Sequence, residues 1–396
     1  MAGPGHGEQF ARLPAVTICS MARIGILCPL PKAATVRSME WSFRTTEELA
    51  AALRVGEVTS EELTEEAIAR IERDDTVINA ICVPDFGRAR AAARGADRAR
   101  ARGEVRPLLG IPVTVKESYD VAGLPTTWGM PRYRDHVPAE DAVQVSRLKA
   151  AGAVVLGKTN VPLALQDVQS FNEIYSTTNN PWRHARTSGG SSGGSAAALA
   201  SGFGALSIGS DIGGSLRTPA HFCGVHAHKP TLGLVANRGM VPPPAPALPV
   251  DLDLAVVGPM ARSARDLTLL LDQLVWAGLT AMPGLTAMPG LPATAVPTGL
   301  SPDGLPVGVQ LIGPMFEDRT PLRLAELLER ETGGSRHQRR APVRRPRVLC
   351  ALRPAMSALT CGASSPSHDP ASGCTSRSPT HPGHPAVHTL PIRSST

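Results

Sequence analysis

The stretch "RTSGGSSGGSAAALASGFGALSIGSDIGGSLRTPA", residues 186–220, decides the fold of this chain. It is rich in glycine and serine, but an alanine and leucine run and the strand-like "ALSIGSD" separate its two glycine clusters. Flexible Gly/Ser linkers lack buried apolar runs of this kind. The stretch therefore predicts a loop, a helix, a strand and a second loop, with serines placed at both loops.

The length and composition of the chain limit the classes of protein to which it can belong. The chain has 396 residues, of which 42% are hydrophobic, enough for a large buried core. No apolar run approaches the roughly 18 residues that a membrane span requires. Seven cysteines are scattered without CxxC pairs, which favours a reduced, cytoplasmic setting. We therefore expect a cytoplasmic protein with no membrane association.

The net charge of +6 is distributed unevenly along the chain. Residues 1–38 carry a net charge of +3 and residues 333–396 carry +8, so the part between them is mildly acidic, at −5. The basic residues thus gather at the two ends. This distribution predicts no nucleic-acid partner for the body of the protein.

Changes in composition and hydrophobic periodicity divide the chain into three parts. Residues 1–38 show little pattern, and we expect an N-terminal extension that is disordered or not native to the domain. Residues 39–332 have the periodicity of a folded domain, which opens with two capping boxes, Thr45 to Glu48 and Thr59 to Glu62. Residues 333–396 are rich in Arg, Pro and Ser without periodicity, which predicts a disordered basic tail.

Strand and helix patterns alternate through the central part. Strands are predicted in "LLGIPVTVKES", "AVVLGKTN", "ALSIGSD" and "VGVQLIG". Helices are predicted in "DAVQVSRLKAAG", "SAAALASG", "SARDLTLLLDQL" with Ser263 as its cap, and "TPLRLAELLERE" with Pro321 at its first position. This alternation predicts an α/β fold with a mixed, mostly parallel sheet and helices on both faces.

Other motifs in the chain have weaker support. "GGSSG" at 189–193 fits a nucleophile elbow, but no strand precedes it, and "SRLK" at 146–149 lacks the companion motifs of penicillin-recognising enzymes. The four residues His221, Cys223, His226 and His228 could bind zinc, but no second ligand cluster follows. The glycine clusters lack a phosphate-binding GK[ST] or GxGxxG. We therefore expect no metal and no cofactor.

The opening stretch resembles the signature of the amidase signature family. "GGSSGGSAAALASG" and "GSDIGGSLRTPAHFCGVHAHKPTLG" look like its two loops, and "GIPVTVKES", "AGAVVLGKTN" and "PVGVQLIG" look like its core strands. The resemblance runs from about Met39 to Glu331. It implies the amidase signature fold and hydrolysis of a small carboxylic amide.

Carried over to this chain, the resemblance implies three catalytic residues. Ser215 would be the nucleophile, Ser191 a bridging serine held by a cis peptide bond, and Lys116 the base. A serine hydroxyl needs a base that takes its proton. A lysine can be that base only when neutral, and burial lowers its pKa. Lys116 ends an apolar strand, where such burial is expected.

The second loop supplies the remaining expected site residues. Gly213 and Gly214 would let the backbone N–H groups of Ile212 to Ser215 converge on an oxyanion. Ile212, Gly213 and Gly214 are therefore the expected oxyanion and substrate residues. Asp211 and Arg217 are expected to fix this loop by an ion pair. Ser192 would be a hydrogen bonder within the first loop, and Lys158, which also follows a glycine, is expected to be structural.

The chain departs from the resemblance near residues 271–275. Family members have a long additional segment there, which supplies much of the acyl-group pocket, so the fold is expected to be incomplete. An inactive remnant of an amidase therefore stays an alternative to an active hydrolase, as does the amidase subunit of an amidotransferase, which would need partner subunits. The resemblance gives a small-molecule amide as the expected partner and leaves a homodimer open.

Overall fold

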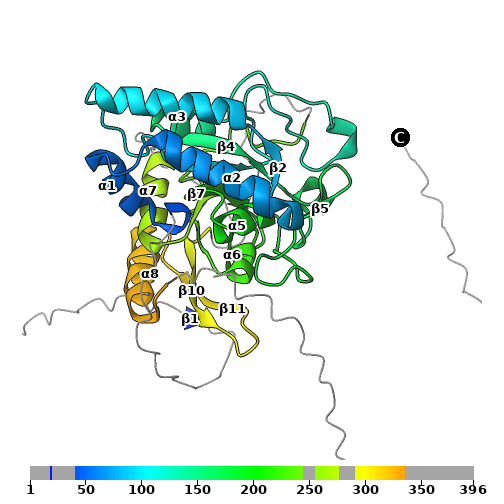
Figure 1. Cartoon of the computed structure of the whole chain (residues 1–396). Coiled ribbons are helices and arrows are strands. Elements are labelled where there is room, and N and C mark those ends of the chain that lie inside the picture. The colour runs from blue at the N-terminus through cyan, green and yellow to red at the C-terminus, as the bar shows by residue number, and fades with distance from the viewer. Residues whose placement is uncertain (1–17, 20–40, 244–254, 276–289, 335–396) are drawn as a thin grey trace, which may run out of the picture. The chain divides into compact units, whose positions relative to one another are not determined.

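The computed structural model describes residues 18–19, 41–243, 255–275 and 290–334 (Figure 1). By contact density the chain divides into two units, Met1–Ala341 and Pro342–Thr396, and all described residues belong to the first. The expected C-terminal tail lies outside the described residues from residue 335 onward, as do residues 1–38 except for Ile18 and Cys19.

The helices and strands follow one another through the described segments. The α-helices are α1 (Thr46–Val55), α2 (Ser60–Ile78), α3 (Phe86–Ala101), α4 (Val143–Ala150), α5 (Gly193–Ala200), α6 (Arg217–Cys223), α7 (Ala264–Leu274) and α8 (Arg319–Thr332). Short 3-10 turns occupy Trp41–Phe43, Pro131–Tyr133 and Leu163–Leu165. The strands are β1 (Ile18–Cys19), β2 (Ile81–Pro84), β3 (Pro112–Lys116), β4 (Val154–Thr159), β5 (Phe171–Asn172), β6 (Ser176–Thr177), β7 (Leu206–Asp211), β8 (His226–Lys229), β9 (Val256–Ala261), β10 (Ala293–Leu300) and β11 (Pro306–Ile312).

One sheet organises the described part of the chain. Its strand order is β1-β11-β10-β8-β9-β7-β3-β4-β2, and β5 and β6 form a separate hairpin. The pairs β3–β4 and β3–β7 are parallel. The other pairs in this sheet are antiparallel. The predicted mixed α/β sheet is therefore confirmed.

The balance of strand directions differs from the expected, mostly parallel one. The parallel run is limited to β7, β3 and β4, because β9 inserts antiparallel between β7 and β8. The five residues 301–305 that join β10 to β11 also allow only an antiparallel hairpin. Neither feature is visible in the alternation of strand and helix patterns.

Helices cover both faces of the sheet, as expected. On one face α1, α4 and α7 contribute leucines and valines to a core that also contains Val113, Val115 and Ile208. On the other face α2, α3, α5 and α6 pack on Val154 and Leu156. Figure 1 shows α2 and α3 side by side across that second face. Val155 belongs to the first core and its neighbours Val154 and Leu156 to the second, so β4 lies between two helical layers.

Local signals set several of these helices in place. Both predicted capping boxes form, with the Thr45 and Thr59 hydroxyls accepting the N–H groups of Glu48 and Glu62. Ser263 caps α7 as predicted, by accepting the N–H of Asp266. The prediction for Pro321 is shifted, because α8 begins two residues earlier, at Arg319. Pro321 therefore lies within the first turn of α8, where a proline is still tolerated.

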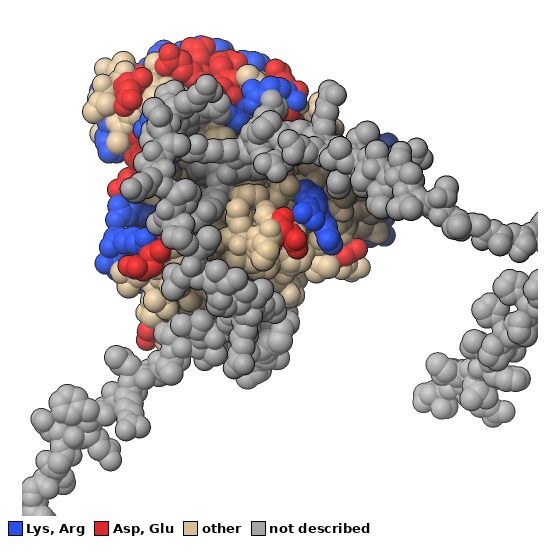
Figure 2. All heavy atoms as spheres, turned by 60° about the horizontal axis from the view of Figure 1, so that its bottom comes forward, with Lys and Arg blue, Asp and Glu red and all other residues tan. Residues whose placement is uncertain are grey.

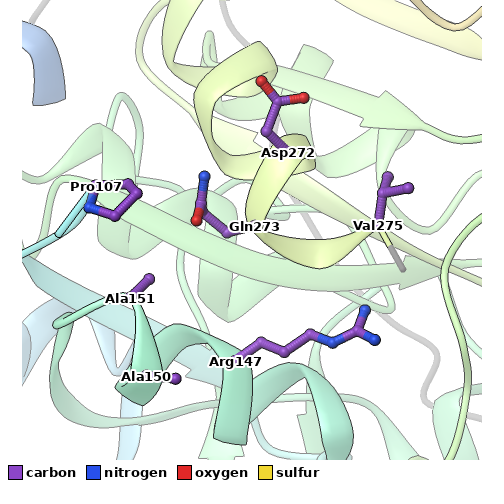
Figure 3. Close-up of a pocket in the computed structure, with 7 residues that line it drawn as sticks. All are labelled: Pro107, Arg147, Ala150, Ala151, Asp272, Gln273 and Val275. Atoms are coloured by element: carbon purple, nitrogen blue, oxygen red, sulfur yellow. The ribbon is translucent and has the colours of Figure 1, made fainter. Parts of the chain in front are cut away.

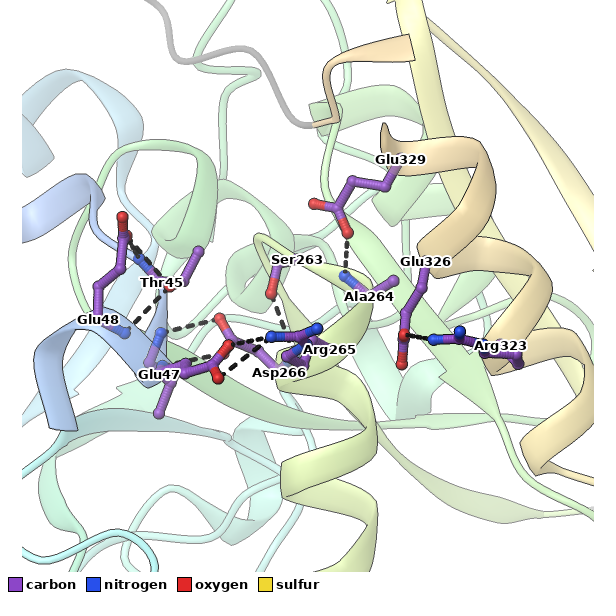
Figure 4. A network of polar contacts seen from close by, with 11 residues as sticks. Thr45, Glu47, Glu48, Ser263, Ala264, Arg265, Asp266, Arg323, Glu326 and Glu329 are labelled. Carbon is purple, nitrogen blue, oxygen red and sulfur yellow. Dashed lines mark hydrogen bonds and ion pairs between the residues drawn. The ribbon is translucent and has the colours of Figure 1, made fainter. Parts of the chain in front are cut away.

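The N-terminus of α7 also joins helices that lie far apart in the sequence (Figure 4). The buried Asp266 carboxylate accepts the N–H of Thr46 at 2.9 Å, at the start of α1. Glu329 of α8 accepts the N–H of Ala264 at 2.8 Å. These contacts satisfy helix N-termini that would otherwise lack acceptors. The network therefore fixes α1 and α8 against α7.

The surface of the described residues is mixed in charge. On the face shown in Figure 2, acidic and basic side chains lie interspersed. Several arginines of α3 pair with carboxylates, among them Arg90 with Glu65 at 2.7 Å. Among the residues that the structure describes, none of the helices has the length and apolarity needed to cross a bilayer.

Candidate active site

Two parallel neighbouring strands end at the same edge of the sheet. β3 ends with Lys116 and β7 ends with Asp211, and the loop before α5 brings Ser191 and Ser192 to this edge. Ligand and catalytic sites of α/β sheets commonly lie outside the carboxyl ends of parallel strands. The sequence therefore delivers the predicted serines and lysine to one place.

Three hydroxyl groups surround the amine of Lys116. Its Nζ lies 2.7 Å from Ser191 Oγ, 3.0 Å from Ser192 Oγ and 3.0 Å from Ser210 Oγ. All four side chains are buried, and the lysine is 0% exposed. The structure thus brings Lys116 and Ser191 together, as the resemblance implies, and the peptide bond between Gly190 and Ser191 is cis.

The environment of Lys116 favours the neutral amine. Burial lowers the pKa of Lys116 from 10.5 to about 7, although the charges of Asp211 and Glu117 oppose this shift. Hydroxyl groups are the immediate neighbours, and they carry no compensating negative charge. A large fraction of the lysine is therefore deprotonated near neutral pH, which a general base requires.

The loop that contains Ser215 lies against the loop that contains Ser191. The N–H of Ser192 donates to the Ser215 carbonyl oxygen at 3.2 Å, so the two loops are adjacent. Ser215 is half-buried, and its hydroxyl makes no hydrogen bond to any described residue. The expected contact between the two serine hydroxyls is therefore absent from the described contacts. Catalytic hydrogen bonds often tighten only when substrate binds.

The backbone around Ser215 provides donors for an oxyanion, with one difference from the expected set. The N–H groups of Ile212, Gly213 and Ser215 have no acceptor among the described residues. The N–H of Gly214 instead donates to Asp211 Oδ1 at 2.8 Å. Gly214 has φ of +124°, a region that favours glycine. Its role in this geometry is to turn the loop.

Asp211 and Arg217 form the expected ion pair beneath this loop. Arg217 Nε and Nη2 donate to the two Asp211 oxygens at 2.9 and 2.8 Å. Burial tends to raise the pKa of Asp211, but the hydrogen bonds and charge of Arg217 lower it on balance. The same carboxylate accepts the N–H of Leu216 at 3.0 Å. Asp211 is therefore ionised and fully occupied in holding the loop.

Ser210 is the site residue that the sequence analysis missed. Its hydroxyl contacts Lys116 from the neighbouring strand. The strands that end near "KES" and "GSD" were both predicted, but nothing in the sequence predicted that they are neighbours. The pairing of Val115 with Ile208 brings the two strand ends together. The contact of Ser210 with Lys116 therefore depends on a strand pairing that the alternation of strand and helix patterns does not give.

The other motifs form no second site within the described part of the chain. Lys158 is buried and donates to the Pro125 carbonyl and to Thr126 Oγ1, away from the serines. His228 bonds to Thr294 and Asp318. No group of three potential metal-ligating side chains occurs among the described residues. Lys158 and His228 hold strands and loops together.

Two surface hollows lie away from this site. One, of about 470 Å³, lies between α4 and α7 and includes Arg147 and Asp272 (Figure 3). The other, of about 410 Å³, follows α3 beside Arg88 and Lys149. Neither is lined by Lys116 or by the serines around it. The Ser215 loop itself is open, with Ile212 53% exposed.

Comparisons with known proteins agree on the family. The family model described as Amidase matches residues 62–278. A subunit of the glutamyl-tRNA(Gln) amidotransferase of Roseiflexus castenholzii is 41% identical over 256 residues, covering 64% of this chain and 50% of that protein. The corresponding subunit of Anaeromyxobacter sp. (strain K) is 45% identical, covering 54% and 42%. The chain therefore spans about half the length of these curated relatives.

Solved structures show the same fold. A protein from a vestigial complex that reveals the origins of an s-triazine catabolic enzyme is 25% identical, with a TM-score of 0.67, covering 75% of this chain and 100% of that one. Peptide amidase from Stenotrophomonas maltophilia is 20% identical, with a TM-score of 0.67, covering 74% and 97%. This second likeness concerns the fold alone.

Proposed function

Since the chain belongs to the amidase family, we propose that it hydrolyses a small carboxylic amide to an acid and ammonia or an amine. The observation that carries this proposal is the buried Lys116 amine, 2.7 Å from the Ser191 hydroxyl and next to the loop of Ser215. A neutral amine in this position is a base within reach of a serine relay.

In the proposed first step Ser215 Oγ attacks the amide carbon. Its proton passes to Ser191 Oγ as the Ser191 proton passes to Lys116 Nζ. The N–H groups of Ile212 and Gly213 stabilise the negative charge that develops on the carbonyl oxygen. The C–N bond then breaks, and the leaving nitrogen takes the proton back through Ser191, which leaves an acyl group on Ser215.

In the second step water replaces the leaving group. Lys116, neutral again, accepts a proton from water through Ser191, and the resulting hydroxide attacks the acyl carbon. The bond to Ser215 breaks, the proton returns to its oxygen, and the acid is released. One amide and one water thus give one acid and one amine, and the enzyme returns to its initial state.

A fluorophosphonate probe tests this proposal without knowledge of the substrate. It needs only an activated Ser215 and an oxyanion site. We expect the protein to be labelled, Ser215→Ala to abolish labelling, and Lys116→Ala to slow it nearly as much, because these residues act as a unit. Absence of labelling in a folded, monodisperse protein would support the alternative of an inactive remnant.

A second candidate function rests on the curated relatives. The two relatives described above belong to glutamyl-tRNA(Gln) amidotransferases, at 41% and 45% identity. A chain with that role would need partner subunits. Hydrolysis of simple amides by the purified chain alone favours the stand-alone amidase. Activity that depends on co-expressed partner subunits would favour the role in an amidotransferase.

A further inference from the structure

We infer that Ser210 is a positioning residue, which together with Ser192 turns the free electron pair of the Lys116 amine toward Ser191. The inference rests on the proposed function, because it explains how the base of that reaction is oriented. It starts from the three hydroxyls that lie within 3.0 Å of Nζ. The catalytic relay uses only one of them.

The hydrogen bonds of Ser192 fix the direction of its contact with the lysine. Ser192 Oγ donates to the Ser210 carbonyl oxygen at 3.3 Å, and it accepts the Ser210 N–H at 3.3 Å. A hydroxyl has one hydrogen, and this one is already donated. Toward Lys116, Ser192 can therefore only accept, and one N–H of the amine must point to it.

The valence of a neutral amine completes the assignment. Such an amine has two N–H bonds and one electron pair. With one N–H directed to Ser192 and the second to Ser210 at 3.0 Å, the electron pair is left for the shortest contact, Ser191 at 2.7 Å. Without the Ser210 hydroxyl, the second N–H could turn to Ser191 and block proton transfer.

The same arrangement serves the protonated lysine. After Ser191 has given up its proton, the ammonium has three N–H donors and three hydroxyl acceptors. The two charges that act on Lys116 are those of Asp211, at the end of β7, and Glu117, directly after β3. Asp211 is bound to Arg217, and Glu117 accepts the N–H of Thr127 at 2.6 Å. Among the described side chains, hydroxyls alone therefore solvate the cation directly.

The test compares two serines of one strand. Ser210→Ala removes the hydroxyl that faces Lys116. Ser207→Ala is the matched control, because Ser207 is also buried on β7 but its hydroxyl bonds to Thr114 at 2.9 Å. Ser210→Thr restores a hydroxyl. The rate of fluorophosphonate labelling is measured against pH for all variants.

We expect Ser210→Ala to slow labelling by roughly 10- to 100-fold, the range for a buried donor that loses its acceptor. The acidic limb of its rate profile should shift to lower pH by about 1 unit. The reason is that the protonated amine loses more hydrogen-bond stabilisation than the neutral amine does when the Ser210 hydroxyl is removed. Ser207→Ala should keep the wild-type profile, and Ser210→Thr should regain most of the rate. A Ser210→Ala profile that matches Ser207→Ala would overturn the inference.

A second measurement separates this inference from the proposed function. The chain has only five lysines, so ¹³C-lysine NMR can follow the titration of Lys116, assigned with Lys116→Met. We expect Ser210→Ala to lower the pKa of Lys116 and Ser207→Ala to leave it unchanged. If the wild type is not labelled but this pKa responds, the proposed function fails while the positioning stands. An unchanged pKa refutes the positioning by itself.

Discussion

Replacing Lys116 by methionine should remove an unusual dependence of stability on pH. Burial lowers the pKa of Lys116 from 10.5 to about 7 in the folded chain, whereas the unfolded chain keeps the ordinary value. Between these two pH values the unfolded state binds a proton that the native state lacks. The contribution of Lys116 to the free energy of unfolding therefore rises with pH in this window.

The size of the effect follows from the two pKa values. Each pH unit adds about 1.36 kcal/mol to the free energy of unfolding of the wild type relative to Lys116→Met. The full interval from about 7 to 10.5 corresponds to about 4 to 5 kcal/mol. Below pH 7 both states of the wild type are protonated, so the cost of burying the cation is fully present and constant.

Urea unfolding of both proteins at pH 7, 8 and 9 measures this difference. Groups common to both proteins cancel, so the difference should grow by about 2 to 3 kcal/mol across these two units. Lys149→Met is the control, because Lys149 is partly exposed and pairs with Asp141 at 2.7 Å. A difference for Lys116→Met that stays flat to within about 0.5 kcal/mol would mean a charged Lys116 and would refute the neutral base.

Two further substitutions test the frame around the site. Asp211→Asn leaves Arg217 without its buried partner and should lower the free energy of unfolding, measured in urea, by about 3 to 5 kcal/mol. It should also slow the labelling of Ser215. Unchanged stability would contradict the role of this ion pair. Gly194→Ala places a Cβ 2.4 Å from the Asn160 nitrogen and should destabilise by about 1 to 3 kcal/mol. Gly87→Ala, in open space on α3, is the control and should be neutral or stabilising by up to about 1 kcal/mol. Equal effects of the two substitutions on stability would argue against close packing at Gly194.

Local sequence signals predicted the elements that local chemistry determines. The capping boxes of α1 and α2 need only residues three positions apart, and "ALSIGSD" is apolar enough to read as a strand. β9 and β10 were not predicted, because Gly258, Pro259 and Pro297 argue against strands. Pro297 is tolerated beside a break in the ladder between β10 and β11. Only the tertiary pairing shows this.

The resemblance to the amidase signature family implied which residues meet at the site, but not how the backbone places each of them. Lys116 and Ser191 were expected together, and the structure places them 2.7 Å apart. The use of the Gly214 N–H by Asp211 was not predictable, because it depends on how tightly the loop turns. Ser210 was missed for a similar reason, since its contact with Lys116 depends on the register of two strands that lie about 90 residues apart along the chain.

The two buried lysines show why the surroundings of Lys116 suit a base. Lys158 is equally buried, and burial lowers its pKa although the charge of Glu117 opposes this shift, but it donates to the Pro125 carbonyl oxygen and to Thr126 Oγ1. A carbonyl oxygen can only accept, so each such contact also stabilises the cation. Beside Lys116, the Ser191 hydroxyl can donate or accept, so this contact accommodates both protonation states. Burial outweighs the opposing charges of Asp211, which is paired with Arg217, and of Glu117, so the pKa of Lys116 falls to about 7 and the lysine can give and take a proton near neutral pH.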